Sequence, residues 1–433
     1  LILALLIPLG WISSLVTERQ WRYEQVRREL SATWGGEQLL QGPVLTIPYV
    51  ERRRDEKGKE SVWRHRAFFL PESLEIDGAI EPETRSRGIF RALLYRVRLR
   101  VTGTFPSPDF GVRKVAPEDV AWREAVLSIG IPDLRGVQSD PQIRWNDAPL
   151  AFRPGPGPIN LYPSGMHALV PGLAEPAAKP HRFAFDVTLT GADALRFVPA
   201  GKDNRVTLTS SWRDPSFDGA FLPVERRVAA TGFDATWRVS YYARSYPQSW
   251  RTDDPGSAPS AETIAGSAFG VRLIESVSFY SKTDRSLKYA MLFLSLTFLT
   301  FLLFEVLAAL RVHPLPYLLV GLALCLFYVL LLSLSEHLGF GSAYAVAASA
   351  TIALIAGYAR KVLCGNVRSA LLASGLAALY GYLYVLLQLE DYALLLGSVG
   401  LFAVLAAVMW VTRDVDWYAM SIRRSETPGS QSS

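Results

Sequence analysis

The sequence predicts a membrane protein of the α plus β class, with a large antiparallel β-sandwich-like domain inserted between a first transmembrane helix and a five-helix C-terminal transmembrane bundle. Three observations predict this fold. Apolar runs lie at the start and in the last third of the chain, alternating strand patterns fill the region between them, and the charge is concentrated in that middle region. Residues 17–288 hold 38 of the 45 Lys and Arg residues and 33 of the 40 Asp and Glu residues. The net charge of +5 therefore belongs to the polar region.

The clearest membrane signal is a pair of apolar runs at residues 288–310 and 315–334, which a short basic break separates. Each run is about 20 residues long, and at 1.5 Å per residue this length matches the ~30 Å hydrocarbon core of a bilayer. Because backbone polar groups must pair within the segment inside lipid, each run has to be a helix. We expect six transmembrane helices at residues 1–16, 288–310, 315–334, 342–359, 369–387 and 392–411, a β-rich domain at 17–287, and a tail at 412–433.

The first apolar run, residues 1–16, stops at a polar Thr17-Glu18-Arg19 segment. It has neither a basic leader nor a small-residue cleavage pattern, so we expect a retained membrane helix that is incomplete at its start. A cleaved signal peptide is the alternative. Residues 18–30 are amphipathic and predict a short juxtamembrane helix.

Strict alternation of apolar and polar residues predicts the strands, most clearly at residues 95–101, where arginines occupy every second position. The same alternation recurs at residues 183–190, 205–210 and 236–241. Residues 44–50 and 61–70 predict two paired strands joined by a charged hairpin tip at 51–60. A period of two places one face on a core and the other in water, which is typical of antiparallel sheets. Frequent Pro and Gly residues mark the turns.

The basic residues of the membrane region predict its orientation, because Lys and Arg gather in cytoplasmic loops. All seven basic residues that follow Lys288 fall in alternate loops or in the tail: Arg311, Arg360, Lys361, Arg368, Arg413, Arg423 and Arg424. The intervening loops, 335–341 and 388–391, hold no Lys or Arg. We therefore expect both termini in the cytoplasm and the β domain on the opposite side of the membrane.

Both cysteines, Cys325 and Cys364, lie in the membrane region. The β domain therefore has no disulfide, and its stability must come from its own hydrophobic core. A region of about 270 residues is long enough to build such a core.

Ionisable residues at membrane depth are costly and are therefore functional candidates. Glu305 lies near the cytoplasmic end of the second predicted helix, where it could be an interfacial carboxylate or part of a relay. Glu336 and His337 end the third helix, and Glu390 and Asp391 form the loop between the fifth and sixth. These four residues could converge as a cation site or a proton-sensing pair, or they could be ordinary polar loop residues.

The remaining patterns favour no particular reaction. Asp214 and Asp218 could act as a general acid and base, but Asp-Pro-Ser is also a common turn. His65, His167 and His181 are widely spaced and lack the patterns of zinc sites. The sequence contains no GxSxG elbow, SxxK motif set or Walker loop. We therefore predict no catalytic residue, no cofactor and no metal site, and the mixed charges argue against nucleic-acid binding.

Longer sequence matches point to a family. Residues 304–321 (FEVLAALRVHPLPYLLVG) and 331–340 (LLSLSEHLGF) resemble the CreD family of bacterial inner-membrane proteins. Shorter matches lie at residues 41–48, 70–74, 207–217, 221–223, 283–290 and 394–397, in the order of the family. The resemblance implies an inner-membrane location, a periplasmic β domain, and a role in cell envelope integrity and in the response to envelope and β-lactam stress. It implies no reaction and no catalytic residues.

The sequence leaves three functions open. The first is a non-enzymatic protein whose β domain binds an envelope component or a membrane protein partner. The second is a membrane enzyme that acts on lipid or peptidoglycan precursors through Glu336, Glu390 and Asp391, which requires these carboxylates to converge. The third is a transporter, which the sequence favours least because the five C-terminal helices lack an evident inverted repeat.

Overall fold

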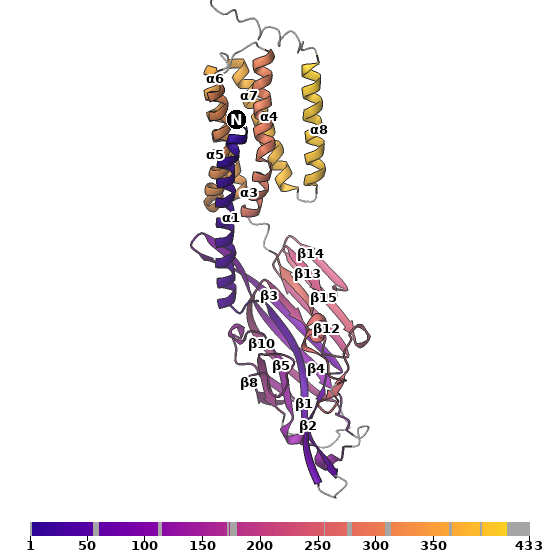
Figure 1. Cartoon of the computed structure of the whole chain (residues 1–433). Helices are drawn as coiled ribbons and strands as arrows, with labels where there is room; N and C mark the ends of the chain where they lie inside the picture. Colours follow the sequence, from indigo (N-terminus) through magenta and orange to yellow (C-terminus); the bar gives the residue numbers. More distant parts are fainter. Residues whose placement is uncertain are drawn as a thin grey trace, which may run out of the picture. The chain divides into compact units, whose positions relative to one another are not determined.

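The computed structural model of the chain describes residues 2–54, 60–110, 115–170, 173, 180–254, 256–274, 279–307, 313–362, 366–389 and 392–413 (Figure 1). It divides into two units. The helical unit comprises Leu1–Trp21 and Val277–Ser433, and the β unit comprises Arg22–Ser276. Helix α1 (Ile2–Thr33) has residues in both units.

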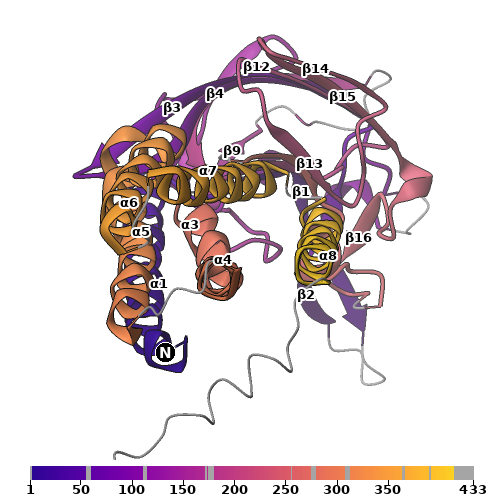
Figure 2. The same cartoon turned by 90° about the horizontal axis from the view of Figure 1, so that it is seen from above.

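The described part of the β unit forms two sheets. The first has nine strands: β13 (Pro215–Gly219), β17 (Phe269–Leu273), β11 (Ala194–Phe197), β1 (Gln38–Arg54), β5 (Val126–Gly130), β9 (Gly165–Leu169) and β8 (Arg153–Pro154) in order, with β2 (Glu60–Phe69) paired to β1 and β16 (Ser249–Arg251) paired to β2. The second has eight: β14 (Glu225–Ala229), β15 (Gly232–Ser240), β12 (Asp203–Ser210), β3 (Ser73–Arg87), β4 (Phe90–Phe105), β10 (His181–Ala192), β6 (Gln142–Trp145) and β7 (Ala148–Ala151). Figure 2 shows the second sheet as a curved layer. Short helices connect the strands: α2 (Ala261–Gly266) and the 3-10 turns at Pro117–Asp119, Trp122–Glu124, Leu134–Gly136 and Tyr241–Ala243.

The alternating segments form strands as predicted. In β4 the side chains of Val97 and Leu99 are buried, whereas those of Arg98 and Arg100 are exposed. Strands β1 and β2 pair antiparallel, and residues 55–59 of the predicted hairpin tip lie outside the described part of the chain. One feature differs from the prediction, because β1 pairs with β11 and β3 pairs with β12 in parallel. Each sheet is therefore mixed.

The two sheets share one hydrophobic core. A single cluster of buried residues contains Ile47 and Tyr49 from the first sheet and Ile76, Val97 and Trp237 from the second. Alternation places these side chains inward on their strands, so the sheets pack face to face. The β unit is therefore a sandwich of two mixed sheets.

The described helices of the helical unit are divided differently than predicted, and three of them are longer. They are α3 (Phe279–Lys288), α4 (Ala290–Leu307), α5 (Pro314–Leu338), α6 (Phe340–Val362), α7 (Asn366–Gln388) and α8 (Ala393–Thr412), in addition to the first part of α1. The helix expected from residue 288 begins at Ala290, and α3 precedes it at an angle of 46°. The loop expected at residues 335–341 is a single residue, Gly339, with a φ of 78°. Glycine suits this position because it adopts a positive φ without a steric penalty.

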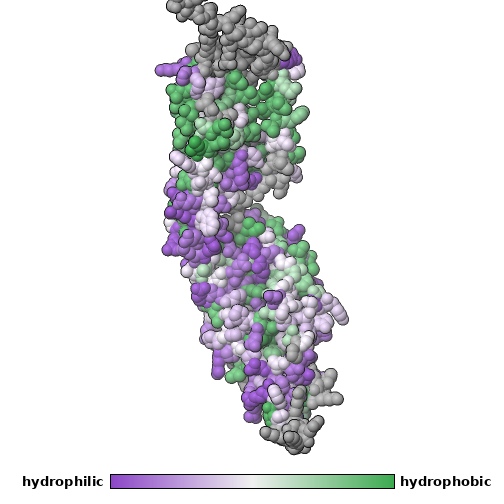
Figure 3. All heavy atoms as spheres, viewed as in Figure 1, coloured by the Kyte–Doolittle hydropathy of each residue, from purple (hydrophilic) through white to green (hydrophobic). Residues whose placement is uncertain are grey.

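Apolar helices dominate the helical unit. Among the described residues, α5, α6 and α7 are long and apolar enough to span a membrane, and α3 with α4 adds a fourth span if the bent pair crosses as one. The apolar part of α8, Leu395–Trp410, is shorter. Large apolar side chains are exposed along these helices, including Leu326, Leu354, Leu371, Phe402 and Trp410. Figure 3 shows hydrophobic residues over the surface of this unit. Such a surface is suited to lipid rather than to water.

Candidate functional site

The predicted membrane-face cluster is described only in part. Glu336 lies in the last turn of α5 with a side chain that is 11% exposed. One carboxylate oxygen accepts a hydrogen bond from the Tyr280 hydroxyl at 3.1 Å and lies 3.7 Å from an Arg19 guanidinium nitrogen. His337 is exposed. Glu336 therefore connects α1, α3 and α5, as a structural carboxylate would.

The other predicted acidic residues do not complete this cluster in the described part of the chain. Glu390 and Asp391 lie outside the described residues. Glu305 lies within α4, and its side chain also lies outside the described part. Convergence of Glu390 and Asp391 with Glu336 therefore stays a prediction, as does a role for Glu305.

Helix α3 contributes buried polar residues that were not among the candidates predicted from the sequence. Tyr280, Thr283 and Ser286 are spaced at three-residue intervals and are all buried. The hydroxyl groups of Ser286 and of Ser335 on α5 are buried without a hydrogen-bond partner among the described residues. The regular spacing of polar residues before the apolar run was the available signal, because residues three apart share one helix face.

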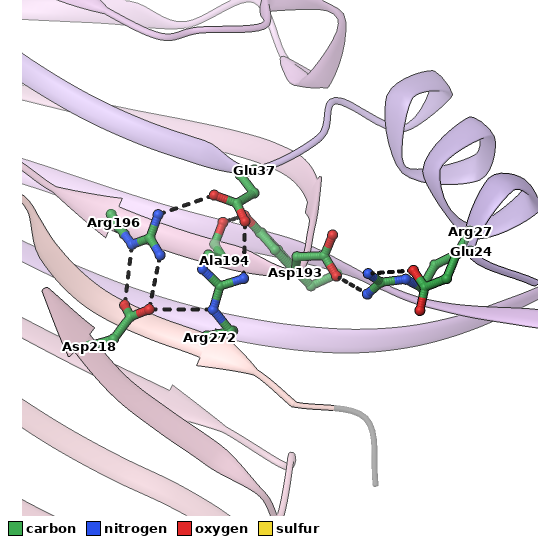
Figure 4. Close-up of polar contacts among 9 residues, drawn as sticks. Glu24, Arg27, Glu37, Asp193, Ala194, Arg196, Asp218 and Arg272 are labelled. Atoms are coloured by element: carbon green, nitrogen blue, oxygen red, sulfur yellow. Dashed lines mark hydrogen bonds and ion pairs between the residues drawn. The ribbon is translucent and has the colours of Figure 1, made fainter. Parts of the chain in front are cut away.

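Asp218, a candidate acid or base, belongs to a ring of ion pairs in the β unit (Figure 4). Arg196 binds both carboxylate oxygens of Asp218, at 3.2 and 2.9 Å, and also contacts Glu37 at 3.1 Å. Arg272 closes the ring, with contacts of 3.3 Å to Asp218 and 3.1 Å to Glu37. Asp193 pairs separately with Arg27 at 2.8 Å. Glu37 directly precedes β1, and the other three ring residues come from β11, β13 and β17, so the ring fastens the edge strand β13 to its sheet.

The ring suits a structural role better than acid–base catalysis. The hydrogen bonds from Arg196 and the charges of Arg196 and Arg272 hold the pKa of Asp218 below its ordinary value. A general acid at neutral pH needs the opposite shift. The second candidate, Asp214, uses its backbone carbonyl to accept bonds from the Trp212 side chain and the Ile274 amide. We therefore interpret both aspartates as structural.

The substitution Asp218→Asn is expected to lower the free energy of unfolding of the β unit by about 1–2 kcal/mol at pH 7, because two guanidinium groups lose a partly buried partner. The folded-state pKa of Asp218 is lowered, so its stabilisation is present above the unfolded pKa of about 3.9 and is lost as the pH falls through the folded pKa. Thermal unfolding of the full chain in detergent at neutral and at strongly acidic pH should therefore show a difference that shrinks in acid. Asp147→Asn, at a far more exposed pair with Arg182, is the control and should change little.

The three histidines of the β unit are in separate places. His65 contacts Glu51, His167 contacts the Gly155 carbonyl, and His181 contacts Asn146. Burial lowers the pKa of His181, which favours the neutral ring at pH 7. Among the described residues, no group of three or more His, Cys, Asp or Glu side chains could hold a metal ion.

The outer face of the eight-stranded sheet is hollowed above its central strands. One hollow of about 490 Å³ lies over β12, β3, β4 and β10, and a neighbouring hollow of about 600 Å³ lies over β3, β12, β15 and the β14–β15 hairpin. Ala79 and Thr209 line both hollows. The residues of the first hollow include Asp77, Ala79, Arg98, Arg100, Asp186, Thr188, Thr207 and Thr209. We call the two hollows together the sheet groove.

The floor and the rim of the sheet groove differ in chemistry. Small residues and threonines form the floor. The threonine hydroxyl groups can donate and accept hydrogen bonds. Exposed ion pairs stand at the rim: Arg98 with Glu81 at 2.7 Å, Arg100 with Asp186 at 2.9 Å, and Arg227 with Asp234 at 2.8 Å. Exposed pairs of this kind contribute little to stability and can exchange partners readily.

Comparisons with known proteins identify the family of the chain. The family model "Inner membrane protein CreD" matches residues 1–418. The chain is 34% identical over 427 residues to inner membrane protein CreD of Escherichia coli K12, covering 97% of this chain and 92% of that protein. Two solved structures of an M1 zinc metallopeptidase from Deinococcus radiodurans, one of them a mutant, are 10% identical. Their TM-scores are 0.19 and 0.18, with 39% of this chain and 39% and 38% of theirs covered, which is too low for any structural argument. From its sequence match over nearly the whole length, the chain belongs to the CreD family of inner membrane proteins.

Proposed function

We propose that this inner membrane protein supports cell envelope integrity, including survival of envelope and β-lactam stress, by binding an envelope component through the sheet groove. No reaction is part of the proposal. The single observation that carries it is the sheet groove itself, which combines a hydroxyl-bearing floor with a rim of exposed ion pairs. This arrangement suits a polar, extended ligand such as a glycan or peptide, which can bond to the threonines and displace the rim pairs.

We further propose that the chain crosses the inner membrane six times, with both termini in the cytoplasm and the β unit in the periplasm. The distribution of basic residues supports this orientation, because Arg360, Lys361 and Arg368 lie at the facing ends of α6 and α7. The adjacent turn at Gly339 carries no Lys or Arg. A periplasmic β unit would meet glycan and peptide components of the envelope.

Filling the groove tests the binding role. The variant Ala79→Tyr with Thr209→Tyr places two large rings where both hollows meet, on outward-facing positions of β3 and β12. In a strain that lacks the protein, we expect this variant to reach normal membrane levels by blot but to lose protection against a β-lactam. Thr102→Tyr, on the outer face of β4 but not lining either hollow, is the matched control and should protect as the wild type does.

A Glu336→Gln variant in the same assay addresses the enzyme alternative, since glutamine can still accept the bond from Tyr280. Full protection by the filled-groove variant would contradict the proposal. Loss of protection by Glu336→Gln together with protection by the filled-groove variant would instead favour a reaction at the membrane face.

A further inference from the structure

A lateral groove runs between α4, α7 and α8 in the helical unit. It consists of a cavity of about 370 Å³ and a second of about 180 Å³, which share Leu296, Gly375, Leu379 and Val404. Figure 2 shows α8 standing apart from α5 and α6. The two cavities are continuous through their shared residues, and we call them the helix groove.

Small residues keep the helix groove open. Gly375, Gly397 and Gly400 line it together with Ala378 and Ala403. A side chain at Gly375 would meet no other atom within 4 Å of its first carbon, so space remains beside α7. The lining is almost wholly apolar, so water gains few hydrogen bonds there, and apolar matter must fill the space in a bilayer.

The length of the helix groove matches one leaflet of a bilayer. It extends from Tyr289, at the bend before α4, to Thr300. These residues are eleven positions apart, which corresponds to about 16 Å along a helix. The hydrocarbon core is about 30 Å thick, so one leaflet is about 15 Å deep. A single hydrocarbon chain fits this length and width, whereas a helix about 10 Å wide that spans the bilayer does not.

Basic residues outnumber acidic residues on α3, the helix that leads to the end of the helix groove at Tyr289. Tyr289 directly follows α3, which carries three basic residues, Lys282, Arg285 and Lys288, and one acidic residue, Asp284. The Lys288 side chain is 70% exposed and lies 2.9 Å from Asp284. These basic side chains favour a phosphate group at this end of the groove.

A buried hydroxyl group faces the inner cavity. Thr300 donates to the Leu296 carbonyl one turn earlier at 2.8 Å, as threonines in helices commonly do. Thr297 is 2% exposed, and its hydroxyl has no partner among the described residues, although it lines the inner cavity. Thr297 therefore adds one polar group to an otherwise mostly apolar lining.

We propose that the helix groove binds the hydrocarbon chain of a phosphate-headed lipid, with its phosphate at the last turn of α3. The inference goes beyond the proposed function and requires only that α4, α7 and α8 lie in the bilayer. The occupant is a diacyl phospholipid, because the groove is about as long as one leaflet is deep, and an isoprenoid phosphate is the competing occupant that the test separates from it.

Native mass spectrometry of the full chain in detergent tests the proposal with three added lipids. The probes are dioleoyl phosphatidylglycerol, undecaprenyl phosphate, and dioleoylglycerol, which lacks phosphate. We expect dioleoyl phosphatidylglycerol to bind with a saturating stoichiometry of one per chain, and dioleoylglycerol to bind at least about tenfold more weakly. Tighter binding of undecaprenyl phosphate than of phosphatidylglycerol would overturn the assignment to a phospholipid.

Two variants of α7 provide a matched pair. Gly375→Leu fills the point where the two cavities meet and should reduce the bound fraction at least about tenfold. Gly381→Leu makes the same change on the same helix, also with open space around it but outside the helix groove, and should bind as the wild type does. Lys288→Gln with Arg285→Gln should weaken binding of the phosphate lipid only.

Three further results would overturn the proposal. The first is a non-saturating ladder of all three lipids, the second is equal binding by Gly375→Leu and the wild type, and the third is an equal loss in Gly381→Leu. Because the measurement uses purified protein, its outcome is independent of the survival assay for the sheet groove.

Discussion

Trp237→Ala is expected to lower the free energy of unfolding of the β unit by about 4 kcal/mol, the range found when large aromatic residues are removed from cores. The Trp237 side chain on β15 is fully buried. Its ring lies 5.7 Å from Phe217 and 6.0 Å from Phe269, which belong to the opposite sheet, and its indole nitrogen donates to the Phe221 carbonyl at 3.2 Å. The substitution would leave a cavity between the sheets and an unpaired carbonyl.

Hydrogen exchange measured by mass spectrometry on peptides of β12 and β15 in the full chain would report this loss. Trp63→Ala is the control, because Trp63 on β2 is 56% exposed and its removal should change exchange little. Equal effects of the two substitutions would contradict the central place assigned to Trp237.

Asn204→Asp is expected to cost about 3–5 kcal/mol at pH 7 although it changes the side-chain volume little. Asn204 is 1% exposed. Its amide nitrogen donates to the Gly201 carbonyl at 2.7 Å and to the Val239 carbonyl at 2.8 Å, and its oxygen accepts from the Gly201 amide at 2.7 Å. A carboxylate would direct a negative oxygen at two carbonyl oxygens in a buried site.

The pH dependence of this variant has a definite sign. Burial would raise the folded-state pKa of the introduced carboxyl above its unfolded value of about 3.9. The ionisation penalty is therefore full above the folded pKa and disappears as the pH falls below the unfolded pKa, where both states are protonated. Because a protonated carboxyl has one O–H donor for the two carbonyls, thermal unfolding should show a gap from wild type that narrows in acid without closing. Asn160→Asp at an exposed position should show no such gap, and a gap independent of pH in Asn204→Asp would contradict this account.

The structural features that could be predicted correctly are those that local sequence patterns determine. The alternation around Val97 predicted the buried and exposed faces of β4, because strand side chains alternate whatever the partner strand. The parallel pairing of β3 with β12 was not predictable in this way, since it joins Ser73 and Asp203 across 130 positions. Helix α3 was missed because its buried face carries Tyr280, Thr283 and Ser286, whereas hydropathy patterns detect apolar faces.

The candidate sites likewise combine features that local sequence patterns predict with features that depend on distant contacts. The position of Glu336 at the end of a helix was predictable from the apolar run before it, but its partners Tyr280 and Arg19 lie 56 and 317 positions away in the chain. The ion-pair ring and both grooves arise where several distant elements meet. No short motif encodes such a place, so it became visible only with the fold.

The single-residue turn at Gly339 has a consequence for the synthesis of the protein. Helices α5 and α6 both have the length and composition to span a membrane, and one residue separates them. Beyond Glu336 and His337 at the end of α5, no hydrophilic loop needs to be moved through the lipid between the two helices. The two helices can therefore enter the bilayer together as one hairpin during translation, with their backbone hydrogen bonds already formed.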